Sequence, residues 1–241
     1  MAMTTLRFLE IQRSGVRCLL AGILLLGGAA FAGTDSMICN VSVPSSHAEL
    51  AEGDQNSSTH LQLSRPMAAG AEVDLDLCSG DLTLSASKNG QLNVTVNLGQ
   101  SSSQHLAGDY LELLDISPHK AIVHLHLPKS VQAKVIVEIP VTVPDVEVNL
   151  SRGELTLAAN QVGGQRQINV GYGQVRVQGN DDTYESMEIN VGLGSLHDHR
   201  SGGENHHFIV AHSFAGSGKG KIEINVGMGH VDVYPSQGQP I

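Results

Sequence analysis

Apolar and polar residues alternate with period two along much of the chain. The clearest runs are residues 92–98, 121–127 and 131–143. Such alternation is typical of strands that bury one face and expose the other. No long stretch has the 3.6-residue spacing of an amphipathic helix. The pattern therefore predicts an all-β fold.

A ten-residue pattern recurs five times within this alternation. Its consensus is apolar, Asn or Asp, apolar, two variable residues, Gly, polar, apolar, polar, apolar, and only Asp198 breaks the final apolar position. The copies cover residues 75–84, 148–157, 168–177, 189–198 and 224–233. Their second positions are Asp76, Asn149, Asn169, Asn190 and Asn225. Their shared glycines are Gly80, Gly153, Gly173, Gly194 and Gly229.

The two halves of each copy are out of phase. Their nearest apolar residues lie five positions apart, so an uninterrupted strand would send them to opposite faces. The glycine lies in this gap, where it can adopt a positive φ and form a bulge or a tight turn. Both apolar pairs can then face one core.

The spacing of the glycines indicates a repeat architecture. Successive glycines from Gly153 onward are 20, 21 and 35 residues apart, and about 20 residues is a typical coil of a β-solenoid. The longest interval predicts a protruding His-rich and Gly-rich loop beside a short strand at residues 208–210. We expect a repetitive β-solenoid-like or stacked β-repeat domain over residues 70–241, after an irregular segment at residues 33–69.

The repeated asparagines suggest a more specific arrangement. If the copies stack as neighbouring strands about 4.8 Å apart, the amides form a column and can bond to one another. This model requires Asn169 to lie beside Asn149 and Asn190. In the alternative, Asn only suits the backbone geometry just before a glycine turn.

The N-terminus has the layout of a secretory signal peptide over residues 1–32. Three arginines precede an apolar run, residues 19–32, which ends in a small-x-small cleavage site. The run is short for an uncleaved spanning helix, which needs about 20 residues. The leader holds three of the 14 basic residues and one of the 24 acidic residues, so 11 and 23 remain. Such an acidic chain is a poor partner for nucleic acid.

Histidine provides the one candidate for a metal site. His197, His199, His206 and His207 lie close together in the chain, and neutral imidazoles bind zinc, copper and nickel. Their spacing matches no established zinc motif, so a solvated polar loop is the alternative. We find no nucleophile elbow and no complete phosphate-binding loop, and we expect neither a catalytic residue nor a cofactor.

The chain resembles a known family from residue 70 to about residue 233. The segment 123–129 (VHLHLPK), the segment 146–157 (VEVNLSRGELTL) and the glycine-centred repeats are similar to the bacterial adhesin-like or "toastrack" β-repeat proteins. The resemblance implies an exported or envelope-associated β-repeat domain and supplies no catalytic residues. We therefore expect a non-enzymatic structural or adhesive envelope protein with a protein or glycan partner. The alternative is a periplasmic metal-binding protein that uses residues 197–212.

The remaining cysteines generate a testable prediction. Cys39 and Cys78 form an even pair in an oxidising compartment, which favours a disulfide worth about 4 kcal/mol in the chain-entropy model. Alkylation of the exported protein, unfolded without reductant, should then label neither residue, and reduction should expose both. Two buried thiols, the alternative, would be labelled on unfolding alone.

Overall fold

The computed structural model describes residues 50–99, 111–127, 131–159 and 164–236, all of which lie in one compact unit, Thr34–Ile241. Every regular element in these residues is a strand, and none is a helix able to cross a membrane. The strands are β1 (Gln55–Asn56), β2 (His60–Pro66), β3 (Glu72–Ala86), β4 (Gln91–Leu98), β5 (Leu111–Ile116), β6 (Lys120–Leu125), β7 (Ala133–Ile139), β8 (Asp145–Ala158), β9 (Gln165–Gln178), β10 (Ser186–Asp198), β11 (Asn205–Ala215) and β12 (Lys221–Tyr234).

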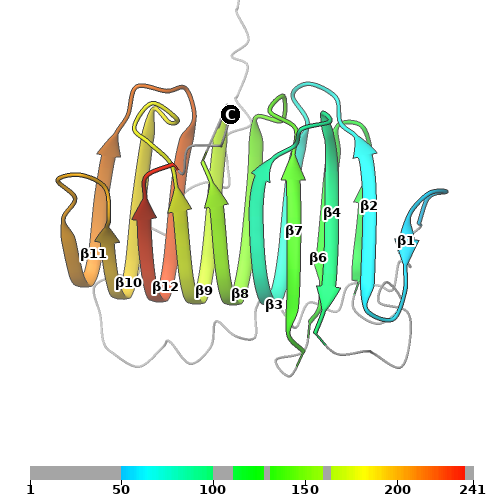
Figure 1. The fold of residues 1–241 in the computed structure, drawn as a ribbon, viewed down its shortest axis with the longest axis horizontal. Helices are drawn as coiled ribbons and strands as arrows, with labels where there is room; N and C mark the ends of the chain where they lie inside the picture. Colours follow the sequence, from blue (N-terminus) through cyan, green and yellow to red (C-terminus); the bar gives the residue numbers. More distant parts are fainter. Residues whose placement is uncertain (1–49, 100–110, 128–130, 160–163, 237–241) are drawn as a thin grey trace, which may run out of the picture. The chain divides into compact units, whose positions relative to one another are not determined.

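Five long parallel strands form the centre of the sheet, and each contains one copy of the repeat. They lie side by side in the order β3, β8, β9, β12, β10 (Figure 1). The copies pair in register, so that the glycines form one row: Gly80, Gly153, Gly173, Gly229 and Gly194. The all-β, stacked-repeat fold predicted from the sequence is confirmed.

Each long strand turns at its glycine into a second leg. The five glycines have φ values from 133° to 154°, and the apolar residues on both sides of the turn are buried in one core. In β3 the first leg pairs with β6 and the second leg pairs with β7. The legs therefore build two layers that are joined along the glycine row, and Figure 1 shows the bends at one end of β8, β9 and β10.

The backbones approach closely along this row. A Cβ atom on Gly173 would lie 1.8 Å from the carbonyl oxygen of Gly153, and the φ of Gly173 is 153°. Any other residue would meet both a forbidden contact and an unfavourable backbone conformation. The glycine is thus required by the stacking itself.

The repeated polar residues form a hydrogen-bonded column. Asn149 donates to Asp76 over 2.9 Å, and Asn169 donates to Asn149 over 2.9 Å. Asn225 donates to Asn169 over 3.1 Å, and Asn190 donates to Asn225 over 3.0 Å. Every bond runs in the same direction, so each amide in the interior of the column both donates and accepts.

The order of the last two copies differs from the expected one. Asn169 lies beside Asn149 and Asn225, while Asn190 lies one strand further out. The reason is the interval between the last two glycines, in which the short strand expected at residues 208–210 is part of a longer strand, Asn205–Ala215. This strand, β11, pairs antiparallel with the outer edge of β10, so β12 returns to the inner side, between β9 and β10.

The sheet also begins earlier than residue 70. Within the segment expected to be irregular, β1 and β2 are strands, and β2 pairs with β4. Leu61 and Leu63 alternate with polar residues and are buried, which is why this short run joins the core. The leader, residues 1–32, and Cys39 lie outside the described residues.

Replacement of Gly173 by Ala tests the stacked bends. We expect a loss of at least about 2 kcal/mol of unfolding free energy, because strain at the bend adds to the collision with Gly153. Gly90→Ala is the matched control, since Gly90 also has a positive φ but no atom near its Cβ position. Urea denaturation measures both, and equal losses in the two variants would contradict the stacking argument.

Candidate functional sites

Two of the predicted histidines meet a carboxylate that lies far away in the sequence. His197, near the end of β10, is in register with Asp232 of β12, and His199 follows directly after β10. The Asp232 Oδ1 atom lies 3.0 Å from His199 Nε2 and 3.4 Å from His197 Nδ1. One ligand atom from each of the three residues lies within 4.8 Å of the others. We call His197, His199, His230 and Asp232 the His–Asp cluster.

His230 and Gln174 approach the second oxygen of the same carboxylate. His230 Nε2 lies 4.0 Å from Asp232 Oδ2, and Gln174 donates to Oδ2 over 2.5 Å. Burial alone would raise the pKa of Asp232, but the hydrogen bonds from His199 and Gln174 and the nearby histidines hold it below its ordinary value. Asp232 is therefore an ionised carboxylate with an exposed fraction of only 8% for its side chain.

The other two predicted histidines lie on opposite faces of β11. The His207 ring is 5.6 Å from the His197 ring, so His207 borders the cluster. The His206 ring is 4.5 Å from the ring of His212, and its Nε2 atom is 3.7 Å from Glu204. Of the four histidines expected to act together, His206 is thus separated from the other three, because β11 is a strand and its side chains alternate.

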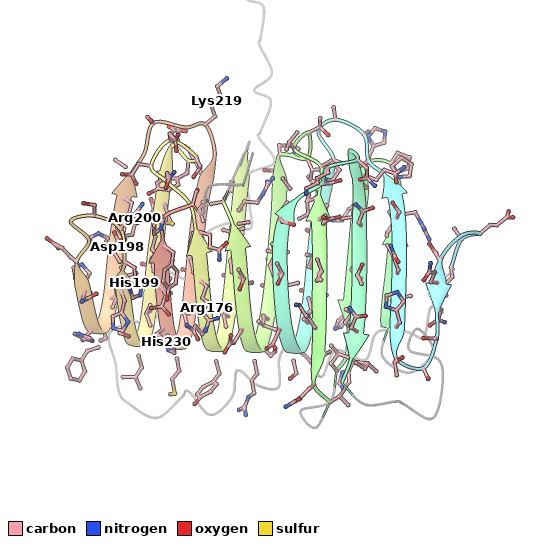
Figure 2. All side chains as sticks on the ribbon, in the orientation of Figure 1. Arg176, Asp198, His199, Arg200, Lys219 and His230 are labelled. Atoms are coloured by element: carbon pink, nitrogen blue, oxygen red, sulfur yellow. The ribbon has the colours of Figure 1, made fainter. Side chains whose placement is uncertain are left out.

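Sequence reasoning missed His230 and Asp232. Both belong to the last repeat copy, and the alternation His-Val-Asp-Val places them on one face of β12. That signal was present, but only the strand order brings this face beside His197. Figure 2 shows His199 and His230 near each other on the sheet, with Arg176 close by.

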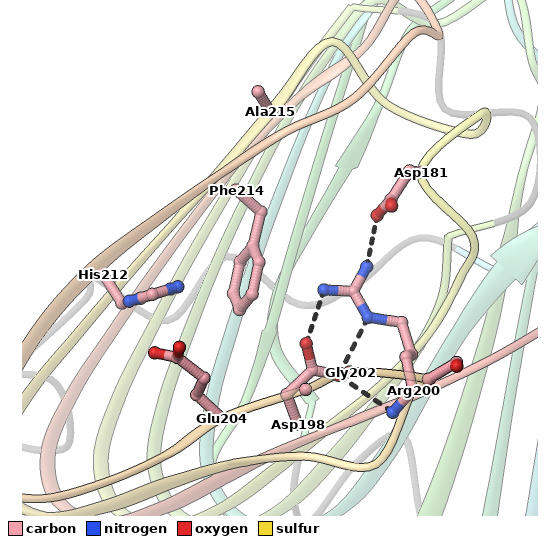
Figure 3. Close-up of a pocket in the computed structure, with 10 residues that line it drawn as sticks. Asp181, Asp198, Arg200, Gly202, Glu204, His212, Phe214 and Ala215 are labelled. Atoms are coloured by element: carbon pink, nitrogen blue, oxygen red, sulfur yellow. Dashed lines mark hydrogen bonds and ion pairs between the residues drawn. The ribbon is translucent and has the colours of Figure 1, made fainter.

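A second group of polar residues lines an open cleft of about 380 Å³ beside β10 and β11. Arg200 lines this cleft and donates to both carboxylate oxygens of Asp198 and to Asp181 (Figure 3). It also donates to the Tyr184 hydroxyl. The guanidinium also lies 4.7 Å above the ring of Phe214. These contacts occupy most of its donors, which leaves little capacity for an anionic ligand.

The Arg200 contacts explain the one irregular position of the repeat. Asp198 is in register with the buried Val233, and its side chain is only 6% exposed. Burial would raise the pKa of Asp198, but the hydrogen bonds from Arg200 hold it below its ordinary value. Burial and the bond to Asp181 raise the pKa of Tyr184 to about 12. At this end of the core, the positive charge of Arg200 therefore compensates the buried negative charge of Asp198.

The exposed large apolar residues form a third feature, at the bends. Tyr172, Met228 and Leu193 are in register on β9, β12 and β10, and the row continues into Phe208 and Ile209 of β11. Leu193 is 51% exposed, Phe208 is 76% exposed and Ile209 is 70% exposed. Side chains project outward from this end of the strands in Figure 2. We call these five residues the apolar ridge.

Two further sequence predictions concern buried residues. Cys78 is buried at the turn of β3, and its Sγ atom lies 3.7 Å from His126 Nδ1. Its predicted partner Cys39 lies outside the described residues, so the disulfide stays a prediction. The alternation of residues 121–127 makes His124 one of the polar positions, yet His124 is buried, in register with Asp76.

Comparison with known proteins finds similarity among solved structures alone. No family model matches the chain, and no curated protein matches it. Among solved structures, a presumed cell adhesion protein from Clostridium sporogenes is similar to this chain. The match covers 72% of this chain and 98% of that protein, with 10% sequence identity and a TM-score of 0.44. The match to a presumed lipid binding protein from Parabacteroides distasonis covers 76% of this chain and 98% of that protein, with 8% sequence identity and a TM-score of 0.21.

The buried ion pair can be tested by changing one partner or both. Arg200→Met leaves Asp198 as a buried unpaired charge, and we expect a loss of about 3–5 kcal/mol of unfolding free energy. Adding Asp198→Val should recover most of this loss, because the neighbouring copy already has Val233 at the equivalent position. Chemical denaturation checks both variants. A double variant as unstable as Arg200→Met would contradict our account of Asp198.

Proposed function

We propose that this chain is an exported, non-enzymatic β-repeat protein that acts as a structural or adhesive component of the cell envelope. The apolar ridge is its contact surface for protein. The signal-peptide pattern of residues 1–32 supports export. The observation that carries the proposal is the conformation of Phe208 within the ridge.

Phe208 has a φ of 75°, and it is the one described residue other than glycine with a positive φ. A bulky residue in this conformation is a rare exception that costs about 1–3 kcal/mol. Phe208 pairs with Gly194 at an irregularity of the β10–β11 pairing, where a glycine would fit without strain. Burial cannot offset this cost, because Phe208 is the most exposed large apolar side chain of the ridge. Strain retained at an exposed aromatic residue favours a role in binding.

The support behind the ridge is rigid. Tyr172, Met228 and Leu193 stand on strands that are locked in register by the glycine row and by the column of asparagines. Side chains held by such a scaffold lose little conformational entropy on binding. A contact surface that is ordered before binding is suited to adhesion.

The composition of the ridge favours a protein partner. Large exposed apolar patches mark protein interaction sites, whereas a glycan site needs aromatic platforms combined with many polar groups. The specific occupant we propose is a second copy of this chain. Three ridge residues, Tyr172, Met228 and Leu193, lie in register on neighbouring strands, so two antiparallel ridges can face each other in an isologous contact. The ridge also ends at β11, which is one of the edge strands of the sheet in the described part of the chain.

Sedimentation velocity of the exported protein over a range of concentrations tests this proposal. We expect reversible dimers for the unchanged chain and monomers for Phe208→Gly. Since glycine tolerates the backbone conformation at this position, Phe208→Gly should keep or raise the unfolding free energy, by up to about 1 kcal/mol. Val141→Asn is the matched control, because Val141 is 46% exposed in the turn before β8, away from the bends.

The two measurements separate a binding role from a structural one. Loss of dimers in a variant that is at least as stable as the unchanged chain supports the ridge as a contact surface. A chain that stays monomeric at every concentration overturns the second copy as the occupant. Dimers that persist in Phe208→Gly, or disappear in Val141→Asn, overturn the ridge.

A further inference from the structure

We infer that the His–Asp cluster binds one divalent transition-metal ion of the Zn²⁺ class, with His197, His199 and Asp232 as ligands and His230 as the fourth. This site differs from the set of four histidines that the sequence suggested. It is independent of the apolar ridge, which lies at the bends of the strands.

The spacing of the ligand atoms fits a tetrahedral ion. Zn²⁺ binds His nitrogen and Asp oxygen at about 2.0–2.2 Å, so neighbouring ligand atoms in a tetrahedron lie roughly 3.3 Å apart. Asp232 Oδ1 is 3.0 Å from His199 Nε2 and 3.4 Å from His197 Nδ1. These two spacings are already close to the values of a metal-bound set.

The fourth ligand has room to move into place. His230 Nε2 lies 4.0 Å from Asp232 Oδ2, and the His230 side chain is 46% exposed. A half-exposed imidazole can change rotamer at little cost. The exposed side chains of His199 and His230 also leave an entry path for the ion from solvent.

Surrounding residues hold the ligands in place, as is usual around bound metal ions. Gln174 donates to Asp232 Oδ2, which orients the carboxylate and leaves Oδ1 directed at the histidines. The His199 ring stacks on Tyr234 with a centroid distance of 4.4 Å and an angle of 3° between the rings. A carboxylate that is almost completely buried and faces three imidazoles has the chemistry of a site for a borderline-soft cation.

Such an ion would connect two neighbouring strands of the sheet that are far apart in the sequence, β10 and β12. Asp232 and His230 belong to β12, which the topology inserts between β9 and β10, and His197 and His199 lie at the end of β10. A bound ion would therefore clamp the last repeat copy against its neighbour. Because metal that binds only the folded state adds to its stability, the clamp has a stability readout as well as a binding readout.

Calorimetric titration of the exported protein with Zn²⁺ tests the site. We expect one ion per chain with micromolar affinity or better, together with a rise in melting temperature. The double variant His199→Ala, Asp232→Asn should lose this binding, and His230→Gln should weaken it by about tenfold or more. Co²⁺ in place of Zn²⁺ should give the visible absorption of a tetrahedral site in the unchanged chain.

Changes in the other histidines serve as matched controls. His206→Ala removes an imidazole that faces His212 and not the cluster, so it should leave affinity and stoichiometry unchanged. Circular dichroism without metal verifies that each variant is folded. Absence of stoichiometric Zn²⁺ binding by the unchanged chain overturns the inference. Binding that survives in the folded double variant, or is lost in His206→Ala, overturns this assignment of the ligands.

Discussion

The close stacking of glycine bends is the constraint on which the rest of this structure depends. Five strands turn at the same position, and a Cβ atom at Gly173 or Gly229 would lie within 2 Å of the neighbouring carbonyl oxygen. The strands can approach this closely only if their glycines are in register. Once the register is set, the remaining residues of the repeat also lie in rows across the strands, one row for each position of the repeat.

Each row has its own physical character. The inner rows are apolar and form the core between the two layers. In the row of Asn and Asp residues, each amide donates a hydrogen bond to the side chain on the next strand, as in stacked β structures. The row at the bend is exposed, and there the apolar ridge forms. The repeat therefore organises the surface as much as the core.

The two candidate sites arise where the repeat is least regular. Phe208 lies opposite Gly194 on β11, a strand that is not a copy of the repeat, and it keeps a conformation that glycine would adopt without strain. The His–Asp cluster forms where β12 is inserted beside β10, so that Asp232 faces His197. The ion pair of Asp198 and Arg200 replaces an apolar core position at the same end of the sheet. The candidate sites and the buried ion pair thus lie where the chain departs from the repeat.

The sequence by itself determined the strands of the repeat, their glycine turns and the rows, because alternation and the position of glycine are local properties of the chain. It could also predict that Asn149 and Asn169 lie together, since their copies are consecutive. Only the tertiary structure decided the order of the strands, because pairing between distant segments depends on which sheet edge is free. β11 covers the outer edge of β10, so Asn225 comes between Asn169 and Asn190. The same placement brings Asp232 to His197 and His199, and separates His206 from them, for reasons that no local pattern contains.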